Sequence, residues 1–511
     1  MEGNGEPMIR TTVERTTRLG RVRGVERLGV ETYRGLRYAQ PARRFEASVV
    51  FDSPWEGVHD ATRFGAISPQ GPVIPEIYGP APDAVCAEDC LFLNIHVPKE
   101  AAAVPRPVIL FIHGGSFTGG SGNFYDGTAL ANGADAVVVC INYRLGLFGA
   151  FELTWLGTGR DGGGQLWLGD QITALQWVRN NITDYGGDPN LVTVIGESAG
   201  AVSVAALCAS PAAAGLVHRG VACSTGYILE EPSNDVVAVI AKARKCSRHE
   251  AVQYLRSAST EELMALQTRG KRLSPRPVVH TPLLPARMED LIAARGVNAV
   301  PMIAGYATHE GLAMELMLKL STGWPRPLIK LVAVLAANLI AAHPAKGYAH
   351  RKAYLKRLKK LTGSWGFSSA FCDAVWTDGF RRGAVEYLEM TKAAGSRGWL
   401  YVLDLPMRFG NWSLPSSHGI DVALTFNVGD DPEATVPSFV DHPGANDLSR
   451  RWVRMLGHFA RHGEPGAALG DWPVYEAPSR ASLFVDATGC GVKHDLEAAF
   501  REQVWQQRKT A

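Results

Sequence analysis

Apolar positions along the chain fall into short continuous runs that alternate with helix-spaced sets. The continuous runs are rich in β-branched residues and are bounded by glycine and turn residues, which is typical of strands buried on both faces of a parallel sheet. They predict strands at Pro107–Ile112, Ala136–Asn142, Leu191–Ile195 and Trp399–Leu405.

Helix-spaced apolar residues predict amphipathic helices between and after these strands. The segment Asp170–Asn181 carries its apolar residues on one face. Asp170 is expected to cap that helix or to open its first turn. Further helices are predicted over Ala201–Ala209 and Asp495–Gln507.

The β-α-β-α order predicts an α/β fold with a mostly parallel central sheet and helices on both faces. Residues 224–299 and 312–395 are mainly helical in pattern. We expect them to be large insertions over the carboxyl edge of the sheet, where the sites of α/β proteins lie. No repeat or linker divides the chain, so residues 1–511 are expected to form a single domain.

Composition and charge narrow the possible functions. The chain has 52 Lys and Arg against 50 Asp and Glu, a net charge of +2 that provides no electrostatic footprint for nucleic acid. Its first residues lack the apolar block of a secretory signal, so we expect a cytoplasmic protein with free thiols. The longest apolar stretch, Leu331–Ala342, is shorter than the about 20 residues that a membrane span needs. We therefore expect no stable membrane anchor.

A candidate nucleophile lies in the pentapeptide Gly196-Glu197-Ser198-Ala199-Gly200, between the strand that ends at Ile195 and the next helix. This is the G-x-S-x-G pattern of a nucleophile elbow, in which a serine on a sharp strand-to-helix turn exposes its hydroxyl above the sheet. The flanking glycines let strand and helix pass almost in contact. A glycine-flanked loop serine is the structural alternative.

A glycine-rich loop, His113–Gly120, follows the strand Pro107–Ile112. An acyl-transfer serine needs backbone N–H groups aimed at the developing oxyanion, and glycines allow the backbone to come that close. Loops of this HGGG type accompany G-x-S-x-G in α/β-hydrolases. The two motifs together favour a serine hydrolase over a plain turn.

These features resemble the type-B carboxylesterase and cholinesterase family of α/β-hydrolases, most of all its bacterial para-nitrobenzyl-esterase-type members. The resemblance implies the α/β-hydrolase fold and hydrolysis of carboxylic esters through an acyl-enzyme, without cofactor or metal. The segments that carry it are Thr32–Phe45, Glu88–Ile95, Phe111–Phe117, Asn142–Gly149, Asp170–Pro189 and Gly196–Gly200.

The resemblance also implies the remaining site residues. Glu310 in Gly305–Gly311 matches the family's acid, and His418 in His418-Gly419-Ile420-Asp421 matches its base. With Ser198 they would form a catalytic triad in the order Ser, acid, His. The oxyanion hole would consist of the backbone N–H groups of Gly115, Ser116 and Ala199. Without the family, His309, His442 and His458 would compete with His418.

Several positions depart from the family or invite other interpretations. Cys90 lacks the upstream cysteine with which relatives form a disulfide, and Cys86 is a poor substitute. Thr225 replaces a usual serine but keeps a hydroxyl. The loop Pro69–Ala87 lacks the tryptophan that holds a quaternary ammonium group, which disfavours a choline substrate. The pattern G-x-G-x-x-G at Gly157–Gly162 is not followed directly by a helix, so dinucleotide binding is not expected.

Two pairs of opposite charge match positions that form buried ion pairs in relatives, and we expect them to be structural. They are Arg44 with Glu88 and Arg144 with Asp170.

The sequence thus favours a carboxylesterase acting on small-to-medium uncharged esters, as a monomer or a homodimer. A carbamate or amide hydrolase with the same triad is the enzymatic alternative, and a lipase with Leu328–Ala342 as its lid is a weaker one. An adhesion-type binding protein is the non-enzymatic alternative, which the presence of all three triad residue types disfavours.

Overall fold

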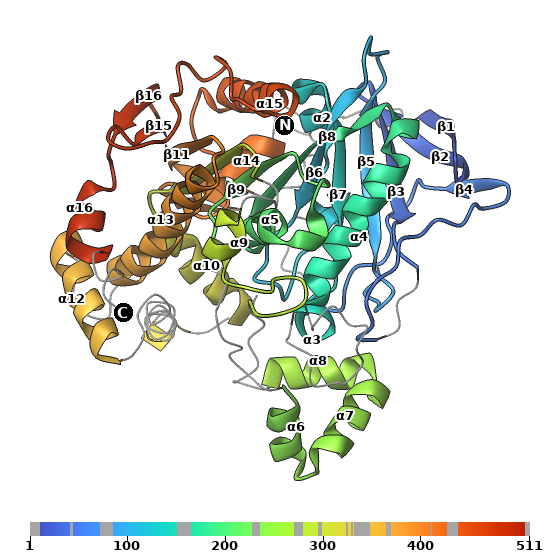
Figure 1. Ribbon diagram of the computed structural model, residues 1–511, viewed down its shortest axis with the longest axis horizontal. Coiled ribbons are helices and arrows are strands. Elements are labelled where there is room, and N and C mark those ends of the chain that lie inside the picture. Colours follow the sequence, from blue (N-terminus) through green and yellow to red (C-terminus); the bar gives the residue numbers. More distant parts are fainter. Residues whose placement is uncertain are drawn as a thin grey trace.

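A central sheet runs through the whole molecule in the computed structural model (Figure 1). The structure describes residues 11–505 except 41–43, 72–84, 151–164, 227–235, 270–278, 295–298, 323–324, 326, 329–330, 332–347, 364–368, 410 and 427–437. The strand order is β1-β2-β3-β5-β7-β6-β8-β9-β10-β11-β15-β16, and β4 pairs with β2. A second sheet of three short strands has the order β13-β12-β14.

The strands of the large sheet are β1 (Thr11–Thr17), β2 (Gly20–Arg27), β3 (Val30–Arg37), β4 (Val58–Asp60), β5 (Phe92–Pro98), β6 (Arg106–Ile112), β7 (Val137–Ile141), β8 (Gly187–Glu197), β9 (Arg219–Cys223), β10 (Met302–Ala307), β11 (Gly398–Asp404), β15 (Ala481–Asp486) and β16 (Gly489–His494). The small sheet consists of β12 (Met407–Phe409), β13 (Trp412–Leu414) and β14 (Ser438–Val440). The four strands expected from the apolar runs are confirmed as β6, β7, β8 and β11.

Pairing is parallel from β7 through β6, β8, β9, β10 and β11 to β15, and it is antiparallel at both ends of the sheet. The inner strands β6 and β7 are buried along their whole length. Their alternate residues face two different cores: Val108 and Leu110 contribute to one, Ile109 and Phe111 to the other. A sheet covered on both faces therefore explains why these strands appear in the sequence as continuous apolar runs.

The N-terminal strands β1 to β3 pair antiparallel and were not predicted. In β1 the side chains are exposed or only partly buried, and its sequence TTVERTT has a single apolar residue. A strand at a solvated edge needs no continuous apolar run, so the apolar pattern gave no signal there.

Helices cover both faces of the sheet (Figure 1). Those of the first half are α2 (Thr128–Ala134), α3 (Gly146–Gly149), α4 (Leu166–Asn181) and α5 (Ala199–Ala209). Within residues 224–299 lie α6 (Val236–Arg244), α7 (Arg248–Ser257), α8 (Thr260–Arg269) and α9 (Met288–Ala293), and within 310–395 lie α10 (Glu310–Thr322), α12 (Tyr348–Thr362) and α13 (Ser369–Ala393). The last helices are α14 (Ile420–Phe426), α15 (Ala445–His462) and α16 (Ala498–Phe500).

Two helix predictions were wrong in detail. Helix α4 begins at Leu166, and Asp170 lies inside it rather than at its cap. Asp170 is fully buried, and its carboxylate pairs with Arg144. Arg144 is thus its partner in place of the free backbone N–H groups that a capping carboxylate would bind at the start of a helix. The predicted helix Asp495–Gln507 is only the short α16 followed by a helical turn, Arg501–Trp505.

The apolar segment Leu331–Ala342 lies outside the described residues except for Leu331. Among the helices that the structure describes, none is both long and apolar enough to span a membrane.

Candidate active site

Ser198 lies at the turn between β8 and α5 in a backbone conformation that L-residues rarely adopt. Its φ of 56° and ψ of −118° hold the residue outside both strand and helix geometry. A Cβ atom on Gly196 would lie 2.2 Å from the carbonyl oxygen of Gly200, and one on Gly200 would lie 2.0 Å from that of Ile112. The two glycines are therefore required by the close passage of strand, turn and helix, as the sequence analysis expected.

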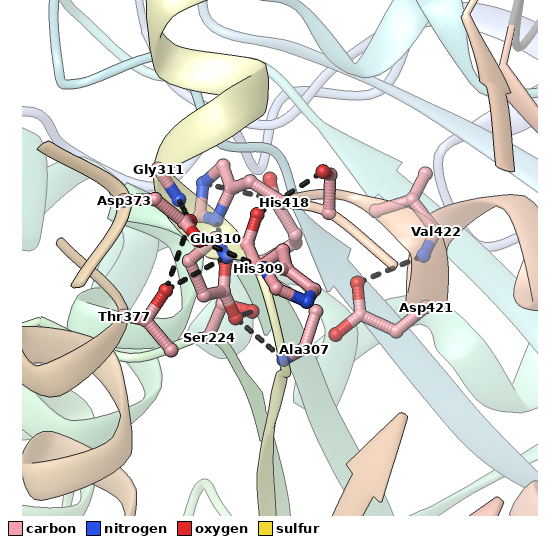
Figure 2. A network of polar contacts seen from close by, with 12 residues as sticks. Ser224, Ala307, His309, Glu310, Gly311, Asp373, Thr377, His418, Asp421 and Val422 are labelled. Atoms are coloured by element: carbon pink, nitrogen blue, oxygen red, sulfur yellow. Dashed lines mark hydrogen bonds and ion pairs between the residues drawn. The ribbon is translucent and has the colours of Figure 1, made fainter. Parts of the chain in front are cut away.

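Glu310 and His418 come together although they are far apart in the sequence (Figure 2). Glu310 begins α10 just beyond β10, and His418 lies just before α14. His418 Nδ1 and Glu310 Oε2 are 2.6 Å apart, and both side chains are buried. The other carboxylate oxygen, Oε1, accepts hydrogen bonds from the Ser224 hydroxyl at 2.6 Å and the Ala307 N–H at 2.7 Å.

The other ring nitrogen of His418 faces the turn that carries Ser198. Nε2 lies 3.0 Å from Oε1 of Glu197, the residue directly before Ser198. The contact is an ion pair only when the imidazole is protonated, and Nε2 has no aligned hydrogen-bond partner among the described residues. Burial opposes the charged imidazolium, but the charges of Glu197 and Glu310 outweigh it and raise the pKa of His418 well above its usual value.

Sequence reasoning gave no role to two carboxyl groups beside His418. One is Glu197; the other is Asp421, three residues after the histidine and 1% exposed. Asp421 Oδ2 accepts a hydrogen bond from the Tyr401 hydroxyl at 2.8 Å. Burial, reinforced by the charges of Glu197 and Glu310, raises the pKa of Asp421 to about 7. The available signal was their place inside the two motifs, but their proximity to His418 is created only by the fold.

The loop after β6 packs against the same turn. A Cβ atom on Gly114 would lie 3.0 Å from the Cβ of Ser198. Gly115, Ser116 and Phe117 have φ values of 100°, 56° and 58°, so three successive residues take the left-handed region. Ala199 follows Ser198 at the start of α5. Of the three residues predicted for an oxyanion hole, Ala199 directly follows Ser198, and Gly115 and Ser116 directly follow Gly114, the loop residue that lies beside Ser198.

The far end of this loop is fixed by Gln70. Its side-chain amide donates to the Gly120 carbonyl at 2.9 Å, and its oxygen accepts from the Gly120 N–H at 2.8 Å. A two-point bond of this kind pins the backbone of the loop without using any N–H group near Ser198. Sequence reasoning assigned no role to Gln70, because no motif marks it.

The remaining predicted positions have structural surroundings. Ser224, and not Thr225, provides the hydroxyl that reaches Glu310. Arg144 and Asp170 form the expected buried ion pair at 2.6 Å. Arg44 and Glu88 also pair, but both side chains keep partial solvent exposure.

Cys86 and Cys90 are free thiols, and Cys90 is buried. No cluster of metal-ligating side chains occurs in the described part of the chain. The pattern Gly157–Gly162 lies outside the described residues.

The competing histidines lie elsewhere. His309 precedes Glu310, but its Nδ1 atom lies 2.8 Å from Asp373 Oδ2. His442 Nδ1 accepts the Gly444 N–H, and His458 Nδ1 contacts the Glu464 carbonyl oxygen. Of the four histidines, His418 is the one that contacts the Ser198 turn.

Comparison with known proteins shows the family of the chain. The sequence profile of the carboxylesterase family matches residues 11–504. The chain is 27% identical to a para-nitrobenzyl esterase of Bacillus subtilis (strain 168), over 96% of this chain and 98% of that protein. It is 31% identical to a cocaine esterase of Oryctolagus cuniculus, over 91% of each chain.

Among solved structures, a thermophilic para-nitrobenzyl esterase superposes with a TM-score of 0.80 at 26% identity, over 97% of this chain and 100% of that one. The mostly parallel sheet and the sequence match over nearly the full length lead to the same conclusion. The chain belongs to the carboxylesterase family, and it is an enzyme of that family with the α/β-hydrolase fold.

Proposed function

We propose that the chain is a serine carboxylesterase in which Ser198 is the nucleophile, His418 the general base and acid, and Glu310 the residue that orients the histidine. The observation that carries the proposal is the buried Glu310–His418 hydrogen bond of 2.6 Å, which leaves Nε2 of the imidazole beside the Ser198 turn. A serine hydroxyl is a weak nucleophile until a neighbouring base takes its proton.

The hydrogen bond determines which nitrogen does this work. When Nδ1 carries the proton that is donated to Glu310, Nε2 of the neutral ring is the unprotonated, basic atom. Nε2 takes the proton of Ser198 as the hydroxyl attacks the ester carbonyl, and it returns the proton to the leaving alcohol. Water then repeats the sequence on the acyl-enzyme. Glu310 stabilises the imidazolium in both halves of the reaction.

The oxyanion hole in this proposal consists of the N–H groups of Gly115, Ser116 and Ala199. None of these groups donates a hydrogen bond to another described residue, so they are available to a ligand. The left-handed conformation of Gly115 and Ser116 supports the assignment, because a strained backbone persists where the surrounding structure demands it. One such donor typically contributes about 3 kcal/mol to the transition state.

The proposed substrates are small-to-medium uncharged carboxylic esters. Relatives named para-nitrobenzyl esterase and cocaine esterase support small-molecule esters as the class. Glu197 and Glu310 lie close to the imidazole, so an anionic substrate beside His418 would meet like charge. An aromatic ring, Phe380, packs on His418 with ring centroids 4.7 Å apart and gives the imidazole an apolar neighbour.

A fluorophosphonate probe tests the assignment of the nucleophile. We expect one modified peptide, which contains Ser198, and no modification of Ser198→Ala. Ser198→Ala and Glu310→Gln should each lower kcat by about 10⁴-fold, as expected for loss of the nucleophile or of the correct histidine tautomer. Ser210→Ala, which removes a buried hydroxyl that donates to the Leu283 carbonyl at the far end of the same helix, is the control and should keep both labelling and activity. Modification of another serine, or none in the folded protein, contradicts the proposal.

The substrate class is tested with an ester, a carbamate and an anilide that share the same acyl and leaving-group framework. The ester should have the largest kcat/KM. A higher kcat/KM for the carbamate or the anilide would keep the triad but replace the esterase assignment.

A further inference from the structure

The N-terminus of α10, which begins with Glu310, has no capping side chain of its own. The residue before it is His309, whose side chain carries no oxygen. The first N–H groups of a helix have no partner within that helix, and they are usually satisfied by a Ser, Thr, Asp or Asn at the N-cap. The N–H groups in question belong to Glu310 and Gly311, so their partners also determine how the acid is held.

Both partners come from α13, a helix of the second insertion (Figure 2). The Thr377 hydroxyl accepts the Glu310 N–H at 3.0 Å, and Asp373 Oδ1 accepts the Gly311 N–H at 2.9 Å. Thr377 and Asp373 are one helical turn apart and are 3% and 8% exposed. A neighbouring helix thus provides the capping oxygens that the local sequence lacks.

The donor and acceptor pattern is consistent throughout this contact. The Thr377 hydroxyl donates its only proton to Asp373 Oδ1 at 3.2 Å, which leaves its lone pairs for the Glu310 N–H. A carboxylate accepts only, so it forces the hydroxyl into this orientation. The negative charge of Asp373 also lies at the positive end of the α10 dipole, where an anion is favourable.

The approach of the two helices is tight. A Cβ atom on Gly311 would lie 2.5 Å from the Cα of Asp373, so the backbones are in contact. Further along α13, Phe380 packs on the imidazole of His418. A Cβ atom on Gly383 would lie 2.3 Å from the carbonyl oxygen of Thr225, the neighbour of Ser224. Helix α13 therefore touches the acid, the histidine and the segment whose serine binds the acid.

We propose that Thr377 and Asp373 are positioning residues for the catalytic acid: by capping α10 from α13 they determine where the Glu310 carboxylate lies relative to His418. This inference rests on the proposed function, since it takes Glu310 as the acid of the triad. Neither residue touches substrate. Their effect reaches the reaction through the Glu310–His418 hydrogen bond. A displacement of the two groups by well under 1 Å is already enough to lower the rate.

The test is Thr377→Val, which keeps the shape of the side chain and removes the hydroxyl. We expect kcat per active site to fall about 10-fold, with KM within about 2-fold of the wild type. A less well placed Glu310 stabilises the imidazolium less, so the acidic limb of the kcat/KM profile should move to lower pH. Active sites are counted with the fluorophosphonate probe, so a partly unfolded preparation does not imitate the effect.

Two control variants separate positioning from stability. Thr377→Ser keeps the hydroxyl and should restore kcat and the pH profile. Thr391→Val removes another buried hydroxyl from α13, one that bonds only the Tyr387 carbonyl within the same helix, and should change neither. If Thr377→Val does not fold, Asp373→Asn is measured against Asp378→Asn, whose carboxylate faces Tyr354 and Trp505 instead of the acid.

Glu310→Gln is measured in the same series. If Glu310→Gln is fully active, the proposed function fails and the positioning role fails with it. If Glu310→Gln is impaired but Thr377→Val behaves like Thr391→Val, only the positioning role is overturned. A loss of kcat in Thr377→Val that Thr377→Ser shares also overturns it, because the hydroxyl would then not be the cause.

Discussion

Helix α13 and the helices α6 to α8 contact the rest of the molecule in different ways. Helix α13 lies along β10 and β11 and contacts the segments of Glu310, His418 and Ser224. The helical lobe, α6 to α8, projects from the lower end of the molecule (Figure 1). It has an apolar cluster of its own, which meets the body through Phe45, Leu147, Phe148 and Leu166.

Among the described residues, the polar contacts between the lobe and the body include the Leu147 N–H, which donates to Gln267 of α8 at 3.0 Å, and a group of contacts around Arg44 and Glu88. Arg44 pairs with Glu88 and donates to the carbonyl of Ala258 at 2.6 Å and to that of Leu255 at 3.2 Å. Thr260 at the start of α8 donates to Glu88 at 2.7 Å. None of these groups touches Glu310 or His418. The comparison teaches that helical segments of similar character differ in their contacts: α13 contacts the residues of the candidate site, whereas the lobe packs around an apolar cluster of its own.

Among the changes that test this comparison, we expect the largest loss of kcat from a change at the contact between α13 and α10. Gly311→Ala would place a methyl group 2.5 Å from a backbone atom of α13, which cannot move aside like a side-chain tip. We expect kcat to fall about 10²-fold, because a displacement approaching 1 Å at the acid has that cost. The free energy of unfolding should fall by about 1–3 kcal/mol through overpacking. Both are measured by kinetics per titrated site and by denaturant unfolding.

Gly379→Ala is the matched control, since a Cβ atom there meets nothing within 4 Å. It lies in the interior of α13, where alanine is favoured over glycine by about 1 kcal/mol, so stability should stay equal or rise. Equal kinetics for the two variants would refute the view that the α10–α13 contact frames the site.

An intermediate effect is expected where the lobe docks. Arg44→Met removes the ion pair with Glu88 and the donors to the α7 carbonyls while keeping an apolar stem. The local loss should be about 1–2 kcal/mol, which makes opening of the lobe about 5–30-fold more frequent. Limited proteolysis should accelerate within residues 236–269, and kcat should change less than about 2-fold.

Arg37→Met provides the comparison for this change, because Arg37 forms a two-point pair with Asp89 at 2.6 and 2.8 Å and no hydrogen bond or ion pair with the described residues of the lobe. It should leave the cleavage rate of the lobe unaltered. A fall in kcat for Arg44→Met as large as that for Gly311→Ala would erase the distinction between the two sets of helices.

Some features of the fold and of the candidate site could be predicted from the sequence, and others could not. The strands β6 and β8 and the turn at Ser198 were predictable because a doubly covered strand requires continuous apolar residues and the close passage requires glycine. The pairing of Glu310 with His418 was reached through family resemblance, since no local pattern links residues so far apart.

The contacts of Thr377 and Asp373 could not be predicted. Their spacing is that of any helix, and their partners are backbone N–H groups in another segment. Asp170 illustrates the same limit: an acid near a helix start suggests a cap, but burial beside Arg144 decides its role.

We expect the smallest effect on stability from His309, whose partly exposed ring contacts Asp373 of α13. The hydrogen bond to Asp373 and the charges of Asp373 and Asp404 raise the pKa of His309 above its usual 6.5. Partial burial and the charge of Arg381 oppose this shift without cancelling it. A histidine whose pKa is higher in the folded state than in the unfolded state contributes its full stabilisation at pH values below its pKa in the unfolded state. That contribution is lost as the pH rises through the pKa of the folded state. The His309 side chain is 44% exposed, so solvent screening limits it to a few tenths of a kcal/mol.

The difference in melting temperature between the wild type and His309→Asn should therefore be positive near pH 6 and smaller near pH 9, by about 1 °C. His249→Asn on the lobe, where the ring contacts Gln253 instead of a carboxylate, provides the comparison and should show no such trend. A difference for His309→Asn that grows toward pH 9 would mean that the neutral imidazole holds Asp373 better than the charged one. The neutral ring of His309 would then hold the capping carboxylate together with Thr377 and Gly311, and the charge of the imidazolium would not be the cause of the stabilisation.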